Sequence, residues 1–203
     1  MSTDSYHHIA KRPATKAPVV FTFHGTGGDE RQFTGLVEQI LPEAGFVSPR
    51  GDVSEQGANR FFRRKAEGVY DMEDLAARTT KMIGFIRAHR EANPDTPIYG
   101  LGYSNGANIL ASVLFEASEL FNRVVLMHPL VPWTPQPNDA IRSLDLLVTA
   151  GRRDPICPLA QTEALVRYFK EQGAAVQLEL HDGGHDVPQQ EVHAISGFLA
   201  QSA

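Results

Sequence analysis

Short apolar runs alternate with longer amphipathic stretches along almost the whole chain, and this alternation limits the possible folds more than any other feature of the sequence. Apolar runs bounded by turn residues fit buried strands, whereas amphipathic stretches of helical period fit helices that cover a sheet. The pattern predicts a mainly parallel, doubly wound α/β sheet with helices on both faces. The predicted strands are residues 19–23, 45–48, 97–101, 123–127, 144–150 and 175–181. The predicted helices are residues 31–41, 72–92, 105–116, 159–171 and 189–200.

Length and composition are those of an ordinary globular protein, so residues 1–203 are expected to form a single domain. The 42% hydrophobic and 21% charged fractions indicate neither disorder nor a membrane protein, and no apolar run approaches the roughly 18 residues of a membrane span. A formal net charge of -5 gives no bulk attraction to nucleic acid, which is not an expected partner. The N-terminal segment lacks an apolar signal core, and Cys157 has no partner for an internal disulfide, so we expect a cytoplasmic location.

The pentapeptide Gly102-Tyr103-Ser104-Asn105-Gly106 stands between a predicted strand and a predicted helix. A G-x-S-x-G sequence in this context places a nucleophilic serine on a sharp turn, and its glycines let the strand and the helix approach closely. Ser104 is therefore the candidate nucleophile. An ordinary turn is the alternative. A dinucleotide-binding loop is excluded, because Asn105 stands where the third glycine would be needed.

The loop at residues 24–29, His-Gly-Thr-Gly-Gly-Asp, directly follows the first predicted strand. Opposite a serine nucleophile, the N–H groups of Thr26 and Asn105 would form an oxyanion hole. The alternatives are a plain turn and a phosphate-binding loop. The latter lacks its terminal Gly-Lys-Ser/Thr.

Asp154 and His185 each follow one of the last two predicted strands, which completes the order Ser, Asp, His that is typical of hydrolases with such a turn. His185 would be the general base, and Asp154 would hold it in the right tautomer. Asp182 and Asp186 lie nearer to His185 in sequence, but neighbours in a tight loop usually point elsewhere.

His185 has two alternative interpretations, a surface histidine and a metal ligand paired with His181. No third metal ligand stands nearby in sequence. We expect neither a metal nor a cofactor.

The proline-rich stretch 129–137 is typical of a loop at the end of a strand. The whole gap from His128 to Leu144 is too short to hold a helical cap. An open, shallow site is therefore expected. The run from Arg60 to Lys65 is typical of a solvated face, although Phe61 and Phe62, with Trp133, could instead wall an acyl pocket.

These segments together resemble the phospholipase/carboxylesterase family of α/β-hydrolases, which includes the acyl-protein thioesterases. The matching pieces, in the family's order, are residues 24–30, 50–51, 55–57, 60–62, 101–108, 151–154 and 183–185. The resemblance implies a minimal α/β-hydrolase fold without a cap domain, a small-molecule ester as substrate, and often a homodimer. It implies a triad of Ser104, Asp154 and His185 with Thr26 and Asn105 as oxyanion donors. Thioesterase members carry a bulky apolar residue where this chain has Thr26, which argues against long lipid acyl chains.

The favoured hypothesis is a serine carboxylesterase that hydrolyses short- to medium-chain carboxylic esters through an acyl-enzyme on Ser104. A thioesterase or lysophospholipase with the same triad is the nearest alternative. A non-catalytic ligand-binding protein of the same fold would be expected to have lost a member of the triad, and none is lost. A metal- or cofactor-dependent enzyme is the remaining alternative.

Overall fold

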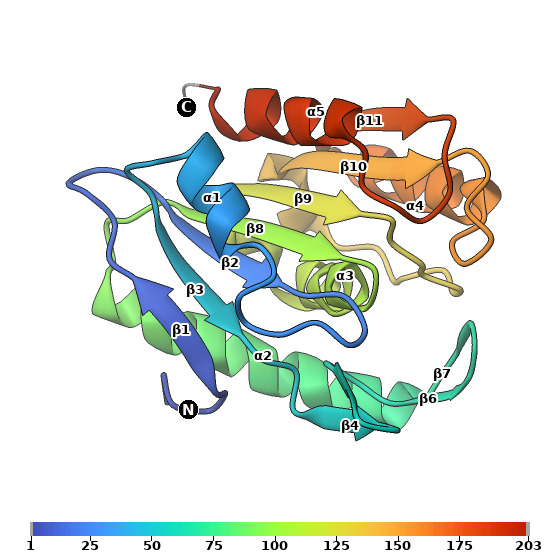
Figure 1. The fold of residues 1–203 in the computed structure, drawn as a ribbon, viewed down its shortest axis with the longest axis horizontal. Coiled ribbons are helices and arrows are strands. Elements are labelled where there is room, and N and C mark those ends of the chain that lie inside the picture. The colour runs from blue at the N-terminus through green and yellow to red at the C-terminus, as the bar shows by residue number, and fades with distance from the viewer. Residues whose placement is uncertain (1, 202–203) are drawn as a thin grey trace.

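A seven-stranded sheet crosses the centre of the molecule in the computed structural model, which describes residues 2–201 (Figure 1). The strand order is β1-β3-β2-β8-β9-β10-β11, and the strands pair in parallel except that β1 runs antiparallel to β3. The sheet is therefore mainly parallel, as predicted. Its strands are β1 (His8–Lys11), β2 (Val19–Phe23), β3 (Gly45–Pro49), β8 (Ile98–Tyr103), β9 (Arg123–Met127), β10 (Asp145–Gly151) and β11 (Ala175–His181).

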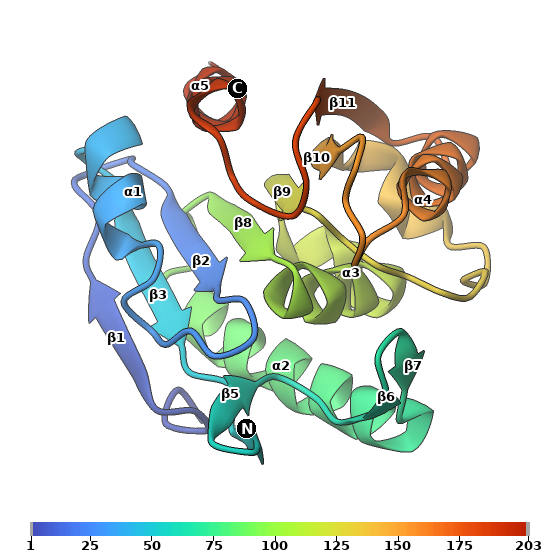
Figure 2. The same ribbon diagram turned by 45° about the vertical axis from the view of Figure 1, so that its right-hand side comes forward.

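Five α-helices within residues 2–201 cover the two faces of this sheet. They are α1 (Thr34–Ile40), α2 (Met72–Ala92), α3 (Asn105–Ala117), α4 (Leu159–Glu171) and α5 (Gln189–Leu199). Figure 2 shows α1 and α5 on one side of the sheet and α2 and α3 on the other. The predicted helix at 31–41 begins three residues later than expected, because residues 31–33 form turns.

Successive residues of the central strands belong to two separate cores, because side chains of a strand point alternately to opposite faces. In β9, Val124 and Leu126 join the core under α2, α3 and α4, while Val125 and Met127 join the core under α1 and α5. All four side chains are fully buried. This burial on both faces explains why the strand reads as a continuous apolar run.

Two small hairpins between β3 and α2 were not predicted. They are β4 (Val53–Glu55) with β5 (Ala58–Arg60), and β6 (Arg64–Ala66) with β7 (Val69–Tyr70). Gln56 and Gly57 connect β4 to β5, both with positive φ, as a type I′ turn requires. Strands of two or three residues are too short to contain an apolar run, so the periodicity of hydrophobic residues in the sequence does not reveal them.

The connection from β9 to β10 contains only a short 3-10 helix, η2 (Asp139–Ser143), and no cap domain, as predicted. A second short 3-10 helix, η1 (Ser118–Leu120), follows α3. Among residues 2–201, no helix is both long enough and apolar enough to cross a membrane.

The chain turns sharply from β8 into α3 at Ser104, which has φ of 51° and ψ of -117°. A Cβ on Gly106 would lie 2.2 Å from the carbonyl oxygen of Phe23 and 2.5 Å from that of His24. A Cβ on Gly102 would lie 2.7 Å from the carbonyl oxygen of Gly106. Both positions need glycine because backbone packs directly on backbone there.

Gly106→Ala is expected to lower the free energy of unfolding by about 1–3 kcal/mol, the usual cost of overpacking, because the backbone atoms that the new methyl meets cannot rotate away. Urea denaturation measures the change. Gly197→Ala in α5 is the matched control, since its added methyl meets nothing within 4 Å and should stabilise the helix by up to about 1 kcal/mol. Equal stability of the two variants would contradict the close packing at Gly106.

Candidate active site

Ser104, Asp154 and His185 meet at the carboxyl edge of the parallel sheet, where β8, β10 and β11 end. His185 Nε2 lies 2.9 Å from Ser104 Oγ, and His185 Nδ1 lies 2.7 Å from Asp154 Oδ2. An ionised carboxylate only accepts hydrogen bonds, so Nδ1 donates to Asp154 and Nε2 is left to accept the serine hydroxyl. The arrangement suits proton transfer from Ser104 to His185.

Asp154 is buried, and its carboxylate receives four hydrogen bonds. Oδ1 accepts from the backbone N–H groups of Ile156 and Cys157 at 2.8 and 2.9 Å. Oδ2 accepts from His185 and from a second imidazole, that of His128, at 2.9 Å. Burial alone would raise the pKa of Asp154, but these hydrogen bonds outweigh burial and hold its pKa below the usual value.

The other two acids considered from the sequence do not contact the His185 ring. The side chain of Asp182 is 88% exposed and pairs with Arg152 at 3.4 Å, and Asp186 is exposed. Asp154 is therefore the carboxylate that the structure places on His185.

Backbone hydrogen bonds join the loops that carry Asp154 and His185. Arg152 N–H donates to the carbonyl of His181 at 2.8 Å, and Arg153 N–H donates to that of Gly183 at 3.0 Å. A Cβ on Gly151 would lie 2.0 Å from the carbonyl oxygen of Gly184, so the two loops are in direct contact. The pairing of β10 with β11 thus continues beyond the ends of the strands.

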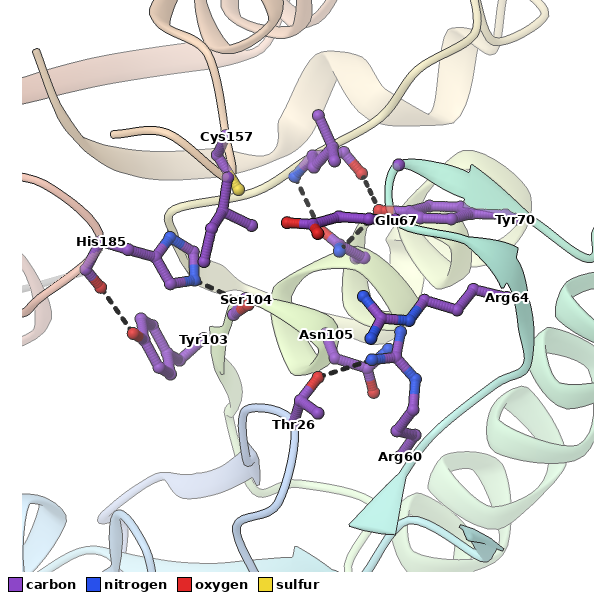
Figure 3. A pocket seen from close by; sticks show the side chains of 14 residues that line it. Thr26, Arg60, Arg64, Glu67, Tyr70, Tyr103, Ser104, Asn105, Cys157 and His185 are labelled. Atoms are coloured by element: carbon purple, nitrogen blue, oxygen red, sulfur yellow. Dashed lines mark hydrogen bonds between the residues drawn. The ribbon is translucent and has the colours of Figure 1, made fainter. Parts of the chain in front are cut away.

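A cavity of about 350 Å³ opens beside Ser104. In Figure 3, Ser104 and His185 lie on one side of it, and the guanidinium groups of Arg60 and Arg64 lie on the other. Arg64 pairs with Glu55 at 2.9 Å, and the same carboxylate pairs with Arg60 at 3.1 Å. The wall facing Ser104 is therefore strongly polar.

Thr26 and Asn105 both line this cavity, and the segment around Arg60 connects them. Arg60 Nη1 donates to Thr26 Oγ1 at 2.8 Å, and Phe61 N–H donates to Asn105 Oδ1 at 2.8 Å. Asn105 is the first residue of α3, whose first-turn N–H groups have no partner within the helix. These contacts fix both side chains beside the cavity, next to the positive end of the α3 dipole.

Phe61, Phe62 and Trp133, the alternative candidates for the wall of an acyl pocket, are not among the residues that line this cavity. Both phenylalanine rings are fully buried, and Trp133 faces a different hollow on the surface. The basic run is not a solvated face throughout either, because Arg60 is only 4% exposed. Burial lowers the pKa of Arg60, and the nearby Arg64 lowers it further. Residue types alone did not show which side chains of this hairpin segment point inward.

The apolar part of the cavity lining comes from other residues, namely Tyr70, Leu130, Ile156 and Cys157. The thiol of Cys157 is buried, which raises its pKa, and it contacts the carbonyl of His128 at 3.1 Å. Cys157 is thus a protonated, packed side chain, as expected from the sequence.

His128 and Glu191 are buried polar residues of the site that sequence reasoning missed. His128 directly follows β9, just as Ser104 and Asp154 follow their strands, and this position was the available signal. Its Nε2 lies 3.1 Å from Glu191 Oε2 in α5. The position of Glu191 does not indicate a role in the site, because in the sequence it is one of several polar residues of an amphipathic helix.

The ring nitrogens of His128 and His181 and the carboxylate of Glu191 lie within 4.8 Å of one another, a spacing that a metal ion could use. The further potential ligands that are missing near His181 in sequence, His128 and Glu191, thus lie near it in the folded structure. However, Gly183 N–H donates to His181 Nδ1 at 3.0 Å, so Nδ1 carries no proton and the neutral ring holds its proton on Nε2. The nitrogen that faces the cluster then has no lone pair for a metal, so the donor set does not fit one. This nitrogen lies 3.5 Å from Glu191 Oε2 without forming a hydrogen bond.

Comparison with known proteins agrees with this architecture. MhqD of Bacillus subtilis (strain 168), a protein that carries the name of a hydrolase, is 37% identical over 186 residues, which are 91% of this chain and 92% of that protein. The structure of a protein of unknown function from Agrobacterium tumefaciens, Atu2452, is 52% identical, with a TM-score of 0.94 and 98% of each chain covered. A Bacillus cereus carboxylesterase is 36% identical, with a TM-score of 0.90, and the match covers 96% of this chain and 93% of that one.

These neighbours confirm the α/β-hydrolase fold and the resemblance to carboxylesterases. The family model of the dienelactone hydrolases matches residues 3–191, which include Ser104, Asp154, His185 and Glu191. The chain is a hydrolase that belongs to the dienelactone hydrolase family.

Proposed function

We propose that the protein is a serine carboxylesterase that hydrolyses short- to medium-chain carboxylic esters through an acyl-enzyme on Ser104. The hydrogen-bonded series from Ser104 through His185 to Asp154, beside an open cavity, is the observation that carries the proposal. The similarity to the Bacillus cereus carboxylesterase supports the same reaction class.

In the proposed mechanism, Ser104 Oγ attacks the ester carbonyl while His185 Nε2 takes the hydroxyl proton. The N–H groups of Thr26 and Asn105 stabilise the oxyanion that forms. His185 then returns the proton to the leaving alcohol, and a water activated by the same imidazole hydrolyses the acyl-enzyme. Asp154 stays ionised throughout and stabilises the positive form of His185.

Ser104 is expected to be the residue that an organophosphonate probe labels, because its hydroxyl is the one that contacts the candidate base. Mass spectrometry of the labelled protein identifies the site, and Ser104→Ala should abolish both labelling and ester turnover. A label on another residue, or ester turnover retained in Ser104→Ala, would exclude the proposed mechanism.

Asp154→Asn should lower kcat roughly 10⁴-fold, by analogy with the serine protease triad, because an amide favours the wrong tautomer of His185. Steady-state kinetics on a nitrophenyl ester measure the loss. Asp182→Asn is the control, since that exposed carboxylate lies beside His185 only in sequence. If Asp154→Asn stayed within about tenfold of wild type while Asp182→Asn was inactive, the acid would be misassigned.

Activity on nitrophenyl esters is expected to fall as the acyl chain grows beyond medium length. Few apolar side chains line the cavity, so added methylenes gain little of the roughly 0.8 kcal/mol that each would gain on burial. Arg64→Leu replaces part of the polar wall and should raise kcat/KM selectively for the longer esters. Values of kcat/KM that rise with chain length in the wild type would contradict the preference.

An acyl thioester of the same chain length, assayed in parallel, tests the thioesterase alternative. A clearly higher kcat/KM for the thioester than for the matched ester would favour that alternative over the carboxylesterase.

A further inference from the structure

Two imidazoles share one oxygen of Asp154. His185 donates to Oδ2 from the cavity side, and His128 lies 2.9 Å from the same atom on the interior side. The centroids of the two rings are 5.1 Å apart. The His128 ring is fully buried, so water cannot replace either of its partners. His128 thus lies within hydrogen-bond distance of the candidate acid, as His185 does.

Both ring nitrogens of His128 face carboxylate oxygens, Nδ1 toward Asp154 and Nε2 toward Glu191 at 3.1 Å. An ionised carboxylate has no proton to donate, so each nitrogen must supply the hydrogen of its own contact. Asp154 accepts three other hydrogen bonds, from Ile156, Cys157 and His185. Glu191 accepts the hydroxyl of Thr149 at its other oxygen. The hydrogen bonds are therefore satisfied when both carboxylates are ionised and His128 is an imidazolium.

Every charged or titratable group around His128 can be named. They are Asp154 in the loop after β10, Glu191 in α5, His181 at the end of β11, His185 in the following loop, Tyr103 at the end of β8, and Cys157 before α4. Burial raises the pKa of Tyr103 to about 12 and also raises that of Cys157, so both are neutral near pH 7. Burial alone would lower the pKa of His128, but Glu191 and Asp154 outweigh it and raise that pKa above 6.5.

The backbone of His128 adds a second, independent observation. Its φ of 50° lies in the left-handed region that residues other than glycine rarely adopt. Such a conformation persists where surrounding contacts over-determine it, and it occurs most often at functional sites. His128 N–H donates to the carbonyl of Thr149 at 2.9 Å, so the strained turn is held on β10, the strand that leads to Asp154.

We propose that His128 is a positioning residue, a buried imidazolium that holds the Asp154 carboxylate against His185 and compensates one of the two buried negative charges. This role presupposes the proposed function of Ser104, Asp154 and His185. With a neutral His185, the buried groups Asp154, Glu191 and His128 carry one net negative charge. Proton transfer from Ser104 gives His185 a positive charge, and the summed charge of these three groups and His185 is then zero.

Without the imidazolium, two negative charges would favour protonation of His185 in the resting enzyme, and a protonated imidazole cannot act as the base. His128 therefore offsets one of the two negative charges near His185 while Asp154 orients the ring.

The direct test is the protonation state of His128 in the wild-type protein, read from ring ¹⁵N shifts after labelling of the histidines. Both ring nitrogens of His128 should be protonated at pH 7.5, where a histidine with an unperturbed pKa near 6.5 is mostly neutral. His128→Gln assigns the signal by its loss. A neutral His128 at this pH, or a metal ion bound stoichiometrically to the purified protein, would overturn the proposal.

His128→Gln should lower kcat about tenfold to a hundredfold, by analogy with partners that orient metal-bound histidines. The acidic limb of its kcat/KM profile should also move to higher pH, because a positive charge near His185 is gone. Thr79→Val is the control, since it removes a buried hydroxyl that bonds Ser112 at 2.7 Å. A loss of activity with an unmoved limb would indicate a merely structural role and overturn the proposal.

Stability should depend on pH with a definite sign. The pKa of His128 is raised in the folded state, so its contribution to the free energy of unfolding is complete below about pH 6.5 and is lost as pH rises through the folded pKa. The stability difference between wild type and His128→Gln should therefore shrink with rising pH. A difference that grows with pH would contradict the imidazolium.

The two proposals fail in different ways. If the phosphonate probe does not label Ser104, the proposed function fails whatever the ¹⁵N shifts show. If Ser104 is labelled and His128 is neutral, only the positioning role fails. Should His128→Gln not fold, sequential backbone assignment of the wild-type protein identifies the His128 ring signals instead, and their shifts still decide.

Discussion

The site depends on the direct backbone contact of α3 with the ends of β2 and β8, which only the glycines at 102 and 106 allow. This contact accompanies the sharp turn at Ser104, and Ser104 and Asn105 both line the cavity. The Asn105 side chain then binds the backbone of Phe61, and Arg60 in turn binds Thr26. One close packing contact thus orders the turn, the hairpin segment and the glycine loop together.

A second constraint is the burial of charge beneath that turn. Each buried ion has a desolvation cost of several kcal/mol unless it is paired and fully hydrogen-bonded. Asp154 meets this condition with four donors, and His128 and Glu191 extend the pairing into the interior. Replacing one member leaves another buried charge unpaired, so the effects of mutations here should not be additive.

Much of the sheet was predictable because its strands are buried on both faces and read as apolar runs. Ser104, Asp154 and His185 were predicted from their positions after such strands, and the structure brings the three side chains into contact. The four short hairpin strands were not predictable, because pairing through a tight turn needs no apolar run. Phe61 directly follows one of these unpredicted strands, so the sequence did not show that its side chain would point into the core.

His128 and Glu191 escaped sequence reasoning because their partners come from several separate elements. A polar residue that ends a buried strand, as His128 does after β9, is nevertheless readable in the sequence. Ser104 stands in the same kind of position after β8, although it was the Gly-x-Ser-x-Gly motif that identified it.

The backbone pairing that continues from β10 and β11 into their loops has a consequence for conformational entropy. Fixing the backbone of one residue has an entropic cost of roughly 1–2 kcal/mol, whether the residue is ordered during folding or during substrate binding. Because Arg152 and Arg153 bond across to residues 181 and 183, the loops that hold Asp154 and His185 are ordered when the sheet forms. That entropy is lost once, at folding, and a substrate that reaches Ser104 does not have to order the two loops again.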